Sequence, residues 1–206
     1  MKNIKANDEK FTVSNCCAII LAAGGSSRLG SPKQLLIYRG ETLLQRTINA
    51  VKHAGIKCII LVLGSSKDLI LSQTDIAGVD VVENENWQTG IASSLATGIK
   101  ALKSIQPLPD AAILMVCDQP YISASILTEL IAEQKTTGKP IIACEYENVT
   151  GVPALFHQSF FEQLENLDGD AGAKKIIKEY SDKVAIVPFP LGIVDIDTQD
   201  VYKKLI

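Results

Sequence analysis

A short glycine- and serine-rich segment near the amino end carries two cations, and this combination suits the binding of phosphate groups. Residues 24–30 read Gly-Gly-Ser-Ser-Arg-Leu-Gly, so that Arg28 lies inside the segment and Lys33 follows it. Small residues allow backbone N–H groups to approach an anion closely, because no side chain stands in the way. The two cations add charge and hydrogen bonds that suit a polyphosphate. The segment predicts a phosphate-binding loop, with an ordinary glycine-rich turn as the alternative.

Two common phosphate-binding motifs do not fit this loop. The pattern G-x-x-x-x-G-K-[ST] of Walker-type NTPases is absent, which argues against that class. Gly24, Gly25 and Gly30 also lack the G-x-G-x-x-G spacing of a dinucleotide-binding loop.

A carboxylate follows the most hydrophobic run of the chain. Residues 111–117 are apolar, and Asp118 comes directly after them, ahead of Gln119 and Pro120. An aspartate is seldom buried without a partner, since desolvating a charge is costly. Carboxylate oxygens suit Mg²⁺, which proteins usually hold with one or two carboxylates and the phosphates of a substrate. We interpret Asp118 as a metal ligand, with a turn-forming or helix-capping aspartate as the alternative.

Two kinds of element alternate along the chain and would position these residues. Apolar runs typical of buried strands lie at residues 18–22, 58–63, 79–83, 111–117, 140–144, 184–187 and 193–196. Segments with helical spacing lie at residues 42–53, 67–74, 90–102, 124–136, 159–164 and 171–180, followed by a short last helix at 198–205. This alternation predicts an α/β fold, Rossmann-like, in which a mostly parallel sheet has helices on both faces.

The expected sheet also explains where the chemistry should lie. An additional strand at residues 151–156 is expected to turn back antiparallel. In sheets of this kind, ligands bind beyond the carboxyl ends of the strands. The glycine-rich loop and Asp118 each follow a predicted strand directly, so we expect them to meet at one edge of the sheet.

The composition narrows the class of protein. The 206 residues are 47% hydrophobic with a net charge of −3, and we expect a flexible tail over residues 1–15 and a single domain over residues 16–206. No basic stripe indicates nucleic-acid binding. No segment reaches the ~20 apolar residues that span a membrane, so we expect a cytoplasmic protein. The five cysteines form no C-x-x-C motif, and we expect reduced thiols.

The glycine-rich loop resembles a known family signature. Residues 21–33 resemble L-A-A-G-x-S-x-R-[ML]-G-x-x-K of the MobA-like nucleotidyltransferases, with Leu29 in the position that is usually Met. The similarity is greatest to the molybdenum cofactor cytidylyltransferase branch, because residues 117–120 also match its C-D-Q-P. The resemblance implies a fold of the nucleotide-diphospho-sugar transferase type.

The resemblance also implies roles on the nucleotide side. Arg28, Lys33 and Asp118 would be catalytic. Mg²⁺, or Mn²⁺ in its place, would be held by Asp118 together with Asp197 or, as second choice, Asp195, because residues 193–200 resemble the family's D-I-D-T-P-E-D region. The residues expected to bind the nucleotide are Leu21, Ala22, Ala23, Gly24, Gly25, Ser26, Arg28, Lys33, Gly90 and Ser94. Trp87 is expected to anchor a loop, with a place in the pocket as the alternative.

Two further stretches resemble the acceptor side of the family. Residues 151–156 resemble G-x-P-x-L-F, and residues 169–174 resemble G-D-x-G-A-R. The acceptor-side residues implied are Gly151, Pro153, Gly169, Asp170 and Lys174. Lys174 replaces the usual Arg, which keeps the charge but loses the bidentate fork. Gln199 stands where the family usually has Pro.

The function implied by the resemblance is transfer of CMP from CTP to molybdenum-bearing molybdopterin. The reaction releases pyrophosphate and forms the cytosine dinucleotide cofactor, and an apo molybdenum hydroxylase is a possible partner. The first alternative is a transferase of the same fold that uses GTP, or that acts on a sugar or polyol phosphate. The second is a carrier of molybdopterin that performs no catalysis.

Overall fold

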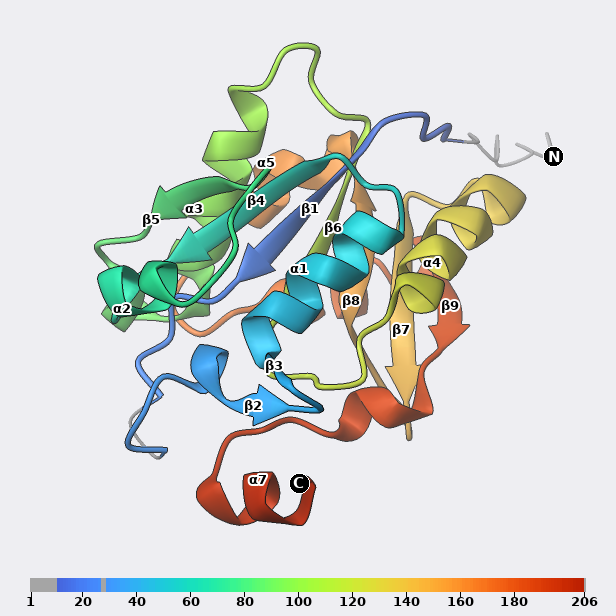
Figure 1. Cartoon of the computed structure of the whole chain (residues 1–206). Coiled ribbons are helices and arrows are strands. Elements are labelled where there is room, and N and C mark those ends of the chain that lie inside the picture. Colours follow the sequence, from blue (N-terminus) through green and yellow to red (C-terminus); the bar gives the residue numbers. More distant parts are fainter. Residues whose placement is uncertain (1–10, 27–28, 206) are drawn as a thin grey trace, which may run out of the picture.

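The computed structural model describes residues 11–26 and 29–205, and a seven-stranded sheet forms its centre (Figure 1). The strand order is β5-β4-β1-β6-β8-β7-β9. The strands are β1 (Cys16–Leu21), β4 (Cys58–Leu63), β5 (Asp80–Glu83), β6 (Ala111–Val116), β7 (Ile141–Tyr146), β8 (Val149–His157) and β9 (Val184–Pro188). Only the pairings of β8 with β6 and β7 are antiparallel within this sheet. The predicted mostly parallel sheet is therefore confirmed, together with its antiparallel strand.

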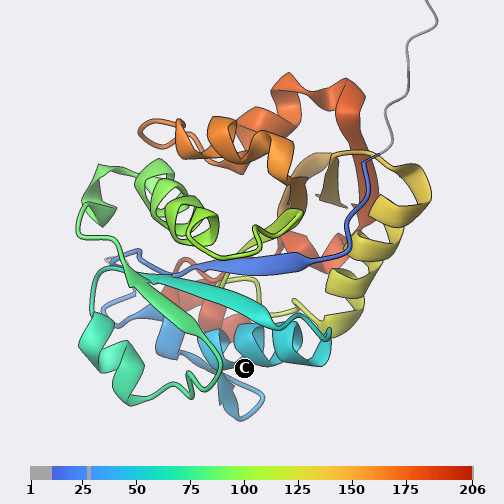
Figure 2. The same cartoon turned by 90° about the horizontal axis from the view of Figure 1, so that it is seen from above.

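Helices cover both faces of the sheet, as the view from above displays (Figure 2). One face packs against α1 (Leu43–His53), α2 (Lys67–Ser72) and α4 (Ala124–Thr137), and the other against α3 (Ile91–Lys103), α5 (Phe161–Glu165) and α6 (Ala173–Glu179). Alternate residues of β1 join opposite cores: Ile20 packs on the α1 side and Ile19 on the α3 side. This alternation explains why strands buried on both faces read as continuous apolar runs.

The carboxyl-terminal region differs from the prediction. Residues 193–196 do not form a strand; a 3₁₀ turn, η5 (Pro190–Ile193), occupies their start. Pro190 sets the backbone angle for this turn, and Gly192 allows it to pack closely, because a Cβ there would lie 2.5 Å from the Phe189 ring. The last predicted helix is present as α7 (Gln199–Leu205). A two-stranded hairpin of β2 (Ile37–Tyr38) and β3 (Glu41–Thr42) was not predicted.

The expectation that all cysteines are reduced thiols is wrong for two of them. Cys17 and Cys58 form a disulfide. They are register partners on the neighbouring parallel strands β1 and β4, with Cα atoms 4.6 Å apart, a proximity that sequence spacing alone does not reveal. Cys117 and Cys144 are free and buried, and burial raises the pKa of each thiol to about 12. These two behave as small hydrophobic side chains.

The amino-terminal segment is attached to the domain from residue 11 onward. Val13 is buried in the core, and the Phe11 backbone N–H donates to the Gly138 carbonyl oxygen over 3.1 Å. Asp110 accepts hydrogen bonds from the Ser14 and Asn15 backbone N–H groups. Residues 1–10 of the expected tail lie outside the described residues. Among the residues that are described, no helix is long and apolar enough to cross a membrane.

Candidate active site

A cavity of about 370 Å³ lies at the carboxyl ends of β1 and β6, where the sequence predicted the phosphate loop and Asp118 to meet. We call it the loop cavity. Its lining residues are Leu21, Ala22, Ala23, Gly24, Gly25, Lys33, Gln34, Trp87, Gln88, Gly90, Ile91, Ser94, Val116, Asp118 and Asp170. The structure thus brings together most of the predicted nucleotide-side residues. Ser26 lies beside them in the loop, whereas Arg28 lies outside the described residues.

The loop is folded back on itself by a glutamine that sequence reasoning missed. Gln34 is fully buried, and its Nε2 donates to the carbonyl oxygens of Ala22 at 2.6 Å and Gly24 at 3.2 Å. The Lys33 backbone N–H donates to Ser26 Oγ over 2.9 Å. These bonds hold the start and the end of the loop together.

Trp87 both lines the loop cavity and anchors the loop, so the two roles considered for it are combined. A Cβ at Gly25 would lie 2.8 Å from the Trp87 ring, and a Cβ at Gly64 would lie 2.9 Å from its side chain. Real Cβ contacts essentially never approach so closely. The indole therefore packs directly on two glycine backbones, one at the loop and one at the end of β4.

Lys33 joins two of the predicted metal-binding carboxylates. Its Nζ forms an ion pair with Asp118 Oδ2 and a second with Asp197 Oδ1 at 3.2 Å. Burial of Lys33 opposes its charge, but Asp118 above all holds the pKa of Lys33 above its usual range. The Asp118 side chain is 14% exposed and that of Asp197 is 47% exposed. The more buried carboxylate thus lies deep in the cavity, and the second lies toward its rim.

The donor set fits a divalent cation that also binds substrate phosphates. Asp118 Oδ1 is buried and has no hydrogen-bond partner within the described part of the chain. Among those residues, no group of three or more His, Cys, Asp or Glu side chains could enclose a metal by itself. Mg²⁺ commonly relies on one or two carboxylates and takes its remaining ligands from phosphates and water. Asp118 and Asp197 satisfy that requirement.

A second cavity, of about 330 Å³, adjoins the first. We call it the distal cavity. It shares Leu21, Ile91, Val116, Asp118 and Asp170 with the loop cavity. Its other lining residues are Leu95, Leu114, Gln119, Tyr146, Val152, Gly172, Ala173, Lys174 and Asp195. Two predicted acceptor-side residues, Asp170 and Lys174, therefore lie in a space that opens beside Asp118.

Asp195 lines the distal cavity, whereas Asp197 forms an ion pair with Lys33. Burial, followed by the negative charges of Asp118 and Asp197, raises the pKa of Asp195 to about 6. Its side chain remains partly open to solvent, which screens these interactions. Sequence reasoning left the choice between the two aspartates open, and the geometry groups Asp197 with Lys33.

The predicted acceptor-side glycines, Gly151 and Gly169, line neither cavity but pack against residues that do, and Gly90, predicted on the nucleotide side, lines the loop cavity. Gly90 has a φ of +112°, and a Cβ there would lie 2.3 Å from the Gly169 carbonyl oxygen. The Ala92 backbone N–H donates to that same oxygen over 3.2 Å, so the 169–170 loop is held against the start of α3. Gly151 packs against Tyr146 and Lys174. Pro153 is buried in β8 and lines neither cavity.

Ser94 is held by another residue that was not predicted. Ser94 is 6% exposed, and its Oγ accepts a hydrogen bond from Asn84 Nδ2 at 3.0 Å. Asn84 itself is buried at the end of β5, and its Nδ2 also donates to Ser93 Oγ at 2.8 Å. This pair of bonds fixes both serines at the start of α3.

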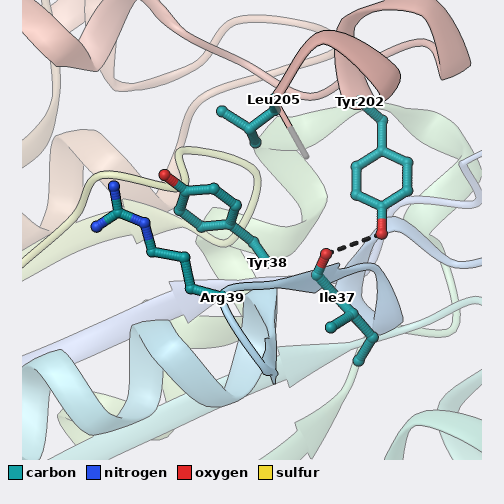
Figure 3. Close-up of a pocket in the computed structure, with 5 residues that line it drawn as sticks. All are labelled: Ile37, Tyr38, Arg39, Tyr202 and Leu205. Atoms are coloured by element: carbon teal, nitrogen blue, oxygen red, sulfur yellow. Dashed lines mark hydrogen bonds between the residues drawn. The ribbon is translucent and has the colours of Figure 1, made fainter.

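A third hollow, about 550 Å³, lies away from these residues, between the β2–β3 hairpin and α7 (Figure 3). It is lined by Ile37, Tyr38, Arg39, Tyr202 and Leu205, none of which was predicted to bind a ligand. The Tyr202 hydroxyl donates to the Ile37 carbonyl oxygen over 2.8 Å and ties α7 to the hairpin.

Comparisons with known proteins agree with this geometry. The family model of the MobA-like NTP transferase domain matches residues 18–184. Nicotine blue oxidoreductase of Paenarthrobacter nicotinovorans is 28% identical over 170 residues, which cover 78% of this chain and 80% of that protein. A probable molybdenum cofactor guanylyltransferase of Bacillus mycoides (strain KBAB4) is 26% identical over 154 residues, covering 74% and 73%.

A solved structure of similar length matches nearly the whole chain. Rv0371c from Mycobacterium tuberculosis H37Rv superimposes with a TM-score of 0.80 at 33% sequence identity, covering 94% of this chain and 98% of that one. Its complex with manganese gives a TM-score of 0.77 at 30% identity, covering 93% and 98%. The region of the chain that matches the family model includes the glycine-rich loop, Lys33 and Asp118. The chain belongs to the MobA-like NTP transferase family and is a nucleotidyltransferase with the nucleotide-diphospho-sugar transferase fold.

Proposed function

We propose that this protein transfers CMP from CTP to molybdenum-bearing molybdopterin. An oxygen of the acceptor's terminal phosphate forms a bond to the α-phosphorus of CTP. The bond from that phosphorus to the β-phosphate oxygen breaks, and pyrophosphate leaves with the electron pair. The protein needs no nucleophile of its own for this reaction; it has to align the two substrates and neutralise the charge that develops.

One observation carries the proposal: in the loop cavity Lys33 pairs with Asp197 and with Asp118, and Asp118 lines both adjoining cavities. A cation at this point can contact the α-phosphate and the attacking phosphate together. Binding of both phosphates brings several negative charges into the space beside the carboxylates, which requires a further cation. The arrangement therefore supports a metal-dependent reaction between two phosphate-bearing substrates.

The remaining residues take roles that follow from their positions. We assign the backbone of residues 24–26, together with Arg28, to the β- and γ-phosphates, and Lys33 to the α-phosphate. We assign Asp118 and Asp197 to Mg²⁺, with Mn²⁺ as a substitute. When bound, the metal would supply positive charge to the phosphates and fix their orientation. Gln34 anchors the start of the loop through its bonds to the Ala22 and Gly24 carbonyl oxygens.

CTP is favoured over GTP by the residue at position 23. Ala23 is buried and lines the loop cavity, so its methyl group occupies space that a glycine would leave open beside a purine. The L-A-A-G form of the loop resembles the cytidylyltransferase branch, as noted from the sequence. Molybdopterin is favoured as the acceptor by the C-D-Q-P match and by similarity to a probable molybdenum cofactor guanylyltransferase.

The test is pyrophosphate release with Mg²⁺ and molybdenum-loaded molybdopterin, comparing CTP, GTP, ATP and UTP. We expect release with CTP, because the methyl group of Ala23 leaves less room beside the base than a glycine would. Asp118→Asn should lower turnover by at least roughly a hundredfold, since it removes a carboxylate charge at the reacting phosphates. The matched control is Asp182→Asn, at an exposed site away from both cavities. Equal activity of Asp118→Asn and wild type would overturn the assignment of the metal site.

A second candidate comes from the relative that is named an oxidoreductase. If no nucleotide supports pyrophosphate release, oxidation of reduced nicotinamide dinucleotides, followed by absorbance, tests that activity directly. Binding of molybdopterin without either reaction would instead favour a carrier. Release with a sugar or polyol phosphate in place of molybdopterin would keep the transferase and replace the acceptor.

A further inference from the structure

The far wall of the distal cavity contains a buried amide with an unsatisfied acceptor. Gln119 is 3% exposed, and its Nε2 donates to the Gly192 carbonyl oxygen over 2.8 Å. Because a carbonyl can only accept, the NH₂ end of the amide must face Gly192. Oε1 is the end left over, and it has no hydrogen-bond partner among the residues that the structure describes. Such an acceptor is costly to bury and gains when a ligand brings an N–H donor.

Tyr146 stands in the same wall and is fixed by two glycines. A Cβ at Gly151 would lie 2.5 Å from the Tyr146 hydroxyl oxygen, and a Cβ at Gly192 would lie 2.8 Å from its ring. The phenol therefore fits closely between two backbones. Burial, and then the negative charge of Asp195, raises the pKa of Tyr146, whereas the neighbouring Gln119 amide opposes this shift. Gln119, Tyr146 and Asp195 all line the distal cavity.

Lys174 adds a cation beside Tyr146. Its Nζ lies 5.8 Å from the centre of the Tyr146 ring, and it lines the same cavity. The wall formed by Gln119 and Asp195 presents hydrogen-bond acceptors, and Lys174 presents a cation. A ligand that complements both has N–H donors on one edge and negative charge or carbonyl oxygen on another.

We infer that Gln119, Tyr146 and Asp195 recognise the heterocycle of the acceptor through adjacent N–H donors, of the kind carried by a 2-amino-4-oxo-pyrimidine edge. This inference rests on the proposed function, and it adds the residues that select the acceptor. Because a site built to hydrogen-bond a polar group rejects an analogue that lacks it, the 2-amino group should be the feature selected.

The test uses two small probes, neither of which needs turnover. Isothermal titration calorimetry compares 2-amino-4-oxopteridine with 4-oxopteridine, which lacks the amino group. We expect wild type to prefer the amino compound by about tenfold. Gln119→Met keeps the volume and removes the acceptor, so it should lose this preference. Gln88→Met, in the loop cavity, is the matched control and should retain it.

Two outcomes would overturn the inference: equal binding of the two probes by wild type, or an undiminished preference in Gln119→Met. If Gln119→Met does not fold, Asp195→Asn at the partly exposed rim gives the same comparison, again with loss of preference expected. CTP affinity, measured in parallel, should be unchanged in Gln119→Met. Failure of the proposed function is a separate result: no pyrophosphate release with any nucleotide, whatever the probe preference.

Discussion

Lys33 binds the same two carboxylates that we assign to the metal ion. Its ammonium group pairs with Asp118 and Asp197, so it competes with a divalent cation for the same carboxylate oxygens. We predict two opposite effects of Lys33→Met. Mn²⁺ should bind about tenfold more tightly without nucleotide, because two carboxylates lose their neutralising partner. Turnover should fall at least roughly a hundredfold, because the phosphates lose a cation at the transition state.

The two effects can be measured on one preparation. Mn²⁺ binding is followed by the electron paramagnetic resonance signal of the free ion, and turnover by pyrophosphate release. Lys100→Met, at an exposed position of α3, is the control and should change neither. A loss of Mn²⁺ affinity in Lys33→Met would separate Lys33 from the metal and contradict the assignment.

At the residue scale, some of the site could be predicted because its members follow strands. Lys33 and Asp118 carry charge at places where a structural role is hard to find, so their types and positions are informative. Gln34 offers no such signal, since glutamine is a residue type that is mostly exposed, and its burial cannot be read from the sequence. The sequence also does not indicate that Tyr146 lies at the site. Its position depends on Gly151 and Gly192, which approach it only after β7, β8 and η5 have packed together.

Among the elements, helix α7 is hydrogen-bonded to the glycine-rich loop. Gln199 Nε2 donates to the Leu29 carbonyl oxygen over 2.7 Å, and Tyr202 binds the β2–β3 hairpin at Ile37 (Figure 3). The Ile196 backbone N–H also donates to the Asp118 carbonyl oxygen over 3.0 Å. The segment that carries Asp197 is thus linked to the loop, the hairpin and the end of β6.

We predict that Gln199→Ala raises the KM for CTP about fivefold and leaves kcat nearly unchanged. One net hydrogen bond of about 1 kcal/mol holds the loop, and its loss weakens ground-state binding. Initial rates over a range of CTP concentrations separate the two constants. Lys203→Ala, on an exposed part of the same helix, serves as the control. A fall in kcat at constant KM would show that Gln199 does not act through loop position.

A carboxylate directly before β6 anchors the amino-terminal segment. Asp110 accepts from Ser14 Oγ at 2.7 Å and from the backbone N–H groups of Ser14 and Asn15 at 2.9 and 3.0 Å. The Ser14 side-chain bond is the main reason why the pKa of Asp110 lies below its usual range. Because the folded pKa is lowered, this carboxylate stabilises the fold at neutral pH and ceases to do so as the pH falls through the folded value.

Asp110→Asn should therefore lower the free energy of unfolding by about 1 kcal/mol at pH 7, a small value because the site is partly exposed. The difference from wild type should narrow below about pH 4, where the wild-type carboxylate becomes protonated. Urea unfolding at a series of pH values measures both effects. Asp182→Asn should match wild type throughout. A difference that persists unchanged in acid would exclude the charge as its source.

Elements were predictable where hydrophobic pattern and length agree. Strands β1, β4, β5, β6 and β7 have apolar runs bounded by turns, and the antiparallel turn at β8 is indicated by the short link after β7. Residues 193–196 also read as a strand, but the preceding Pro190 and Gly192 form η5, which ends sheet pairing at β9. The β2–β3 hairpin has two-residue strands, too short to produce a pattern.

At the scale of the whole molecule, the sheet order places two binding spaces on either side of β6. The loop cavity lies toward β1 and the distal cavity toward β8, and both include Asp118 and Val116. The antiparallel strand β8 makes this possible, because it places Gly151 and Val152 beside the carboxyl end of a parallel strand. Under the proposed function, the two substrates would occupy these neighbouring cavities at the same time, with their phosphates near Asp118.

This arrangement predicts direct transfer within a ternary complex. Among the described lining residues of the two cavities there is no histidine or cysteine to form a covalent intermediate, and the nearby Cys117 is buried with its pKa raised to about 12. Double-reciprocal plots with CTP and acceptor varied should therefore intersect. Labelled pyrophosphate should not exchange into CTP unless the acceptor is present. Parallel plots, together with exchange of pyrophosphate in the absence of the acceptor, would instead require a nucleotidylated enzyme. The two substrates would then react one after the other and not within one complex.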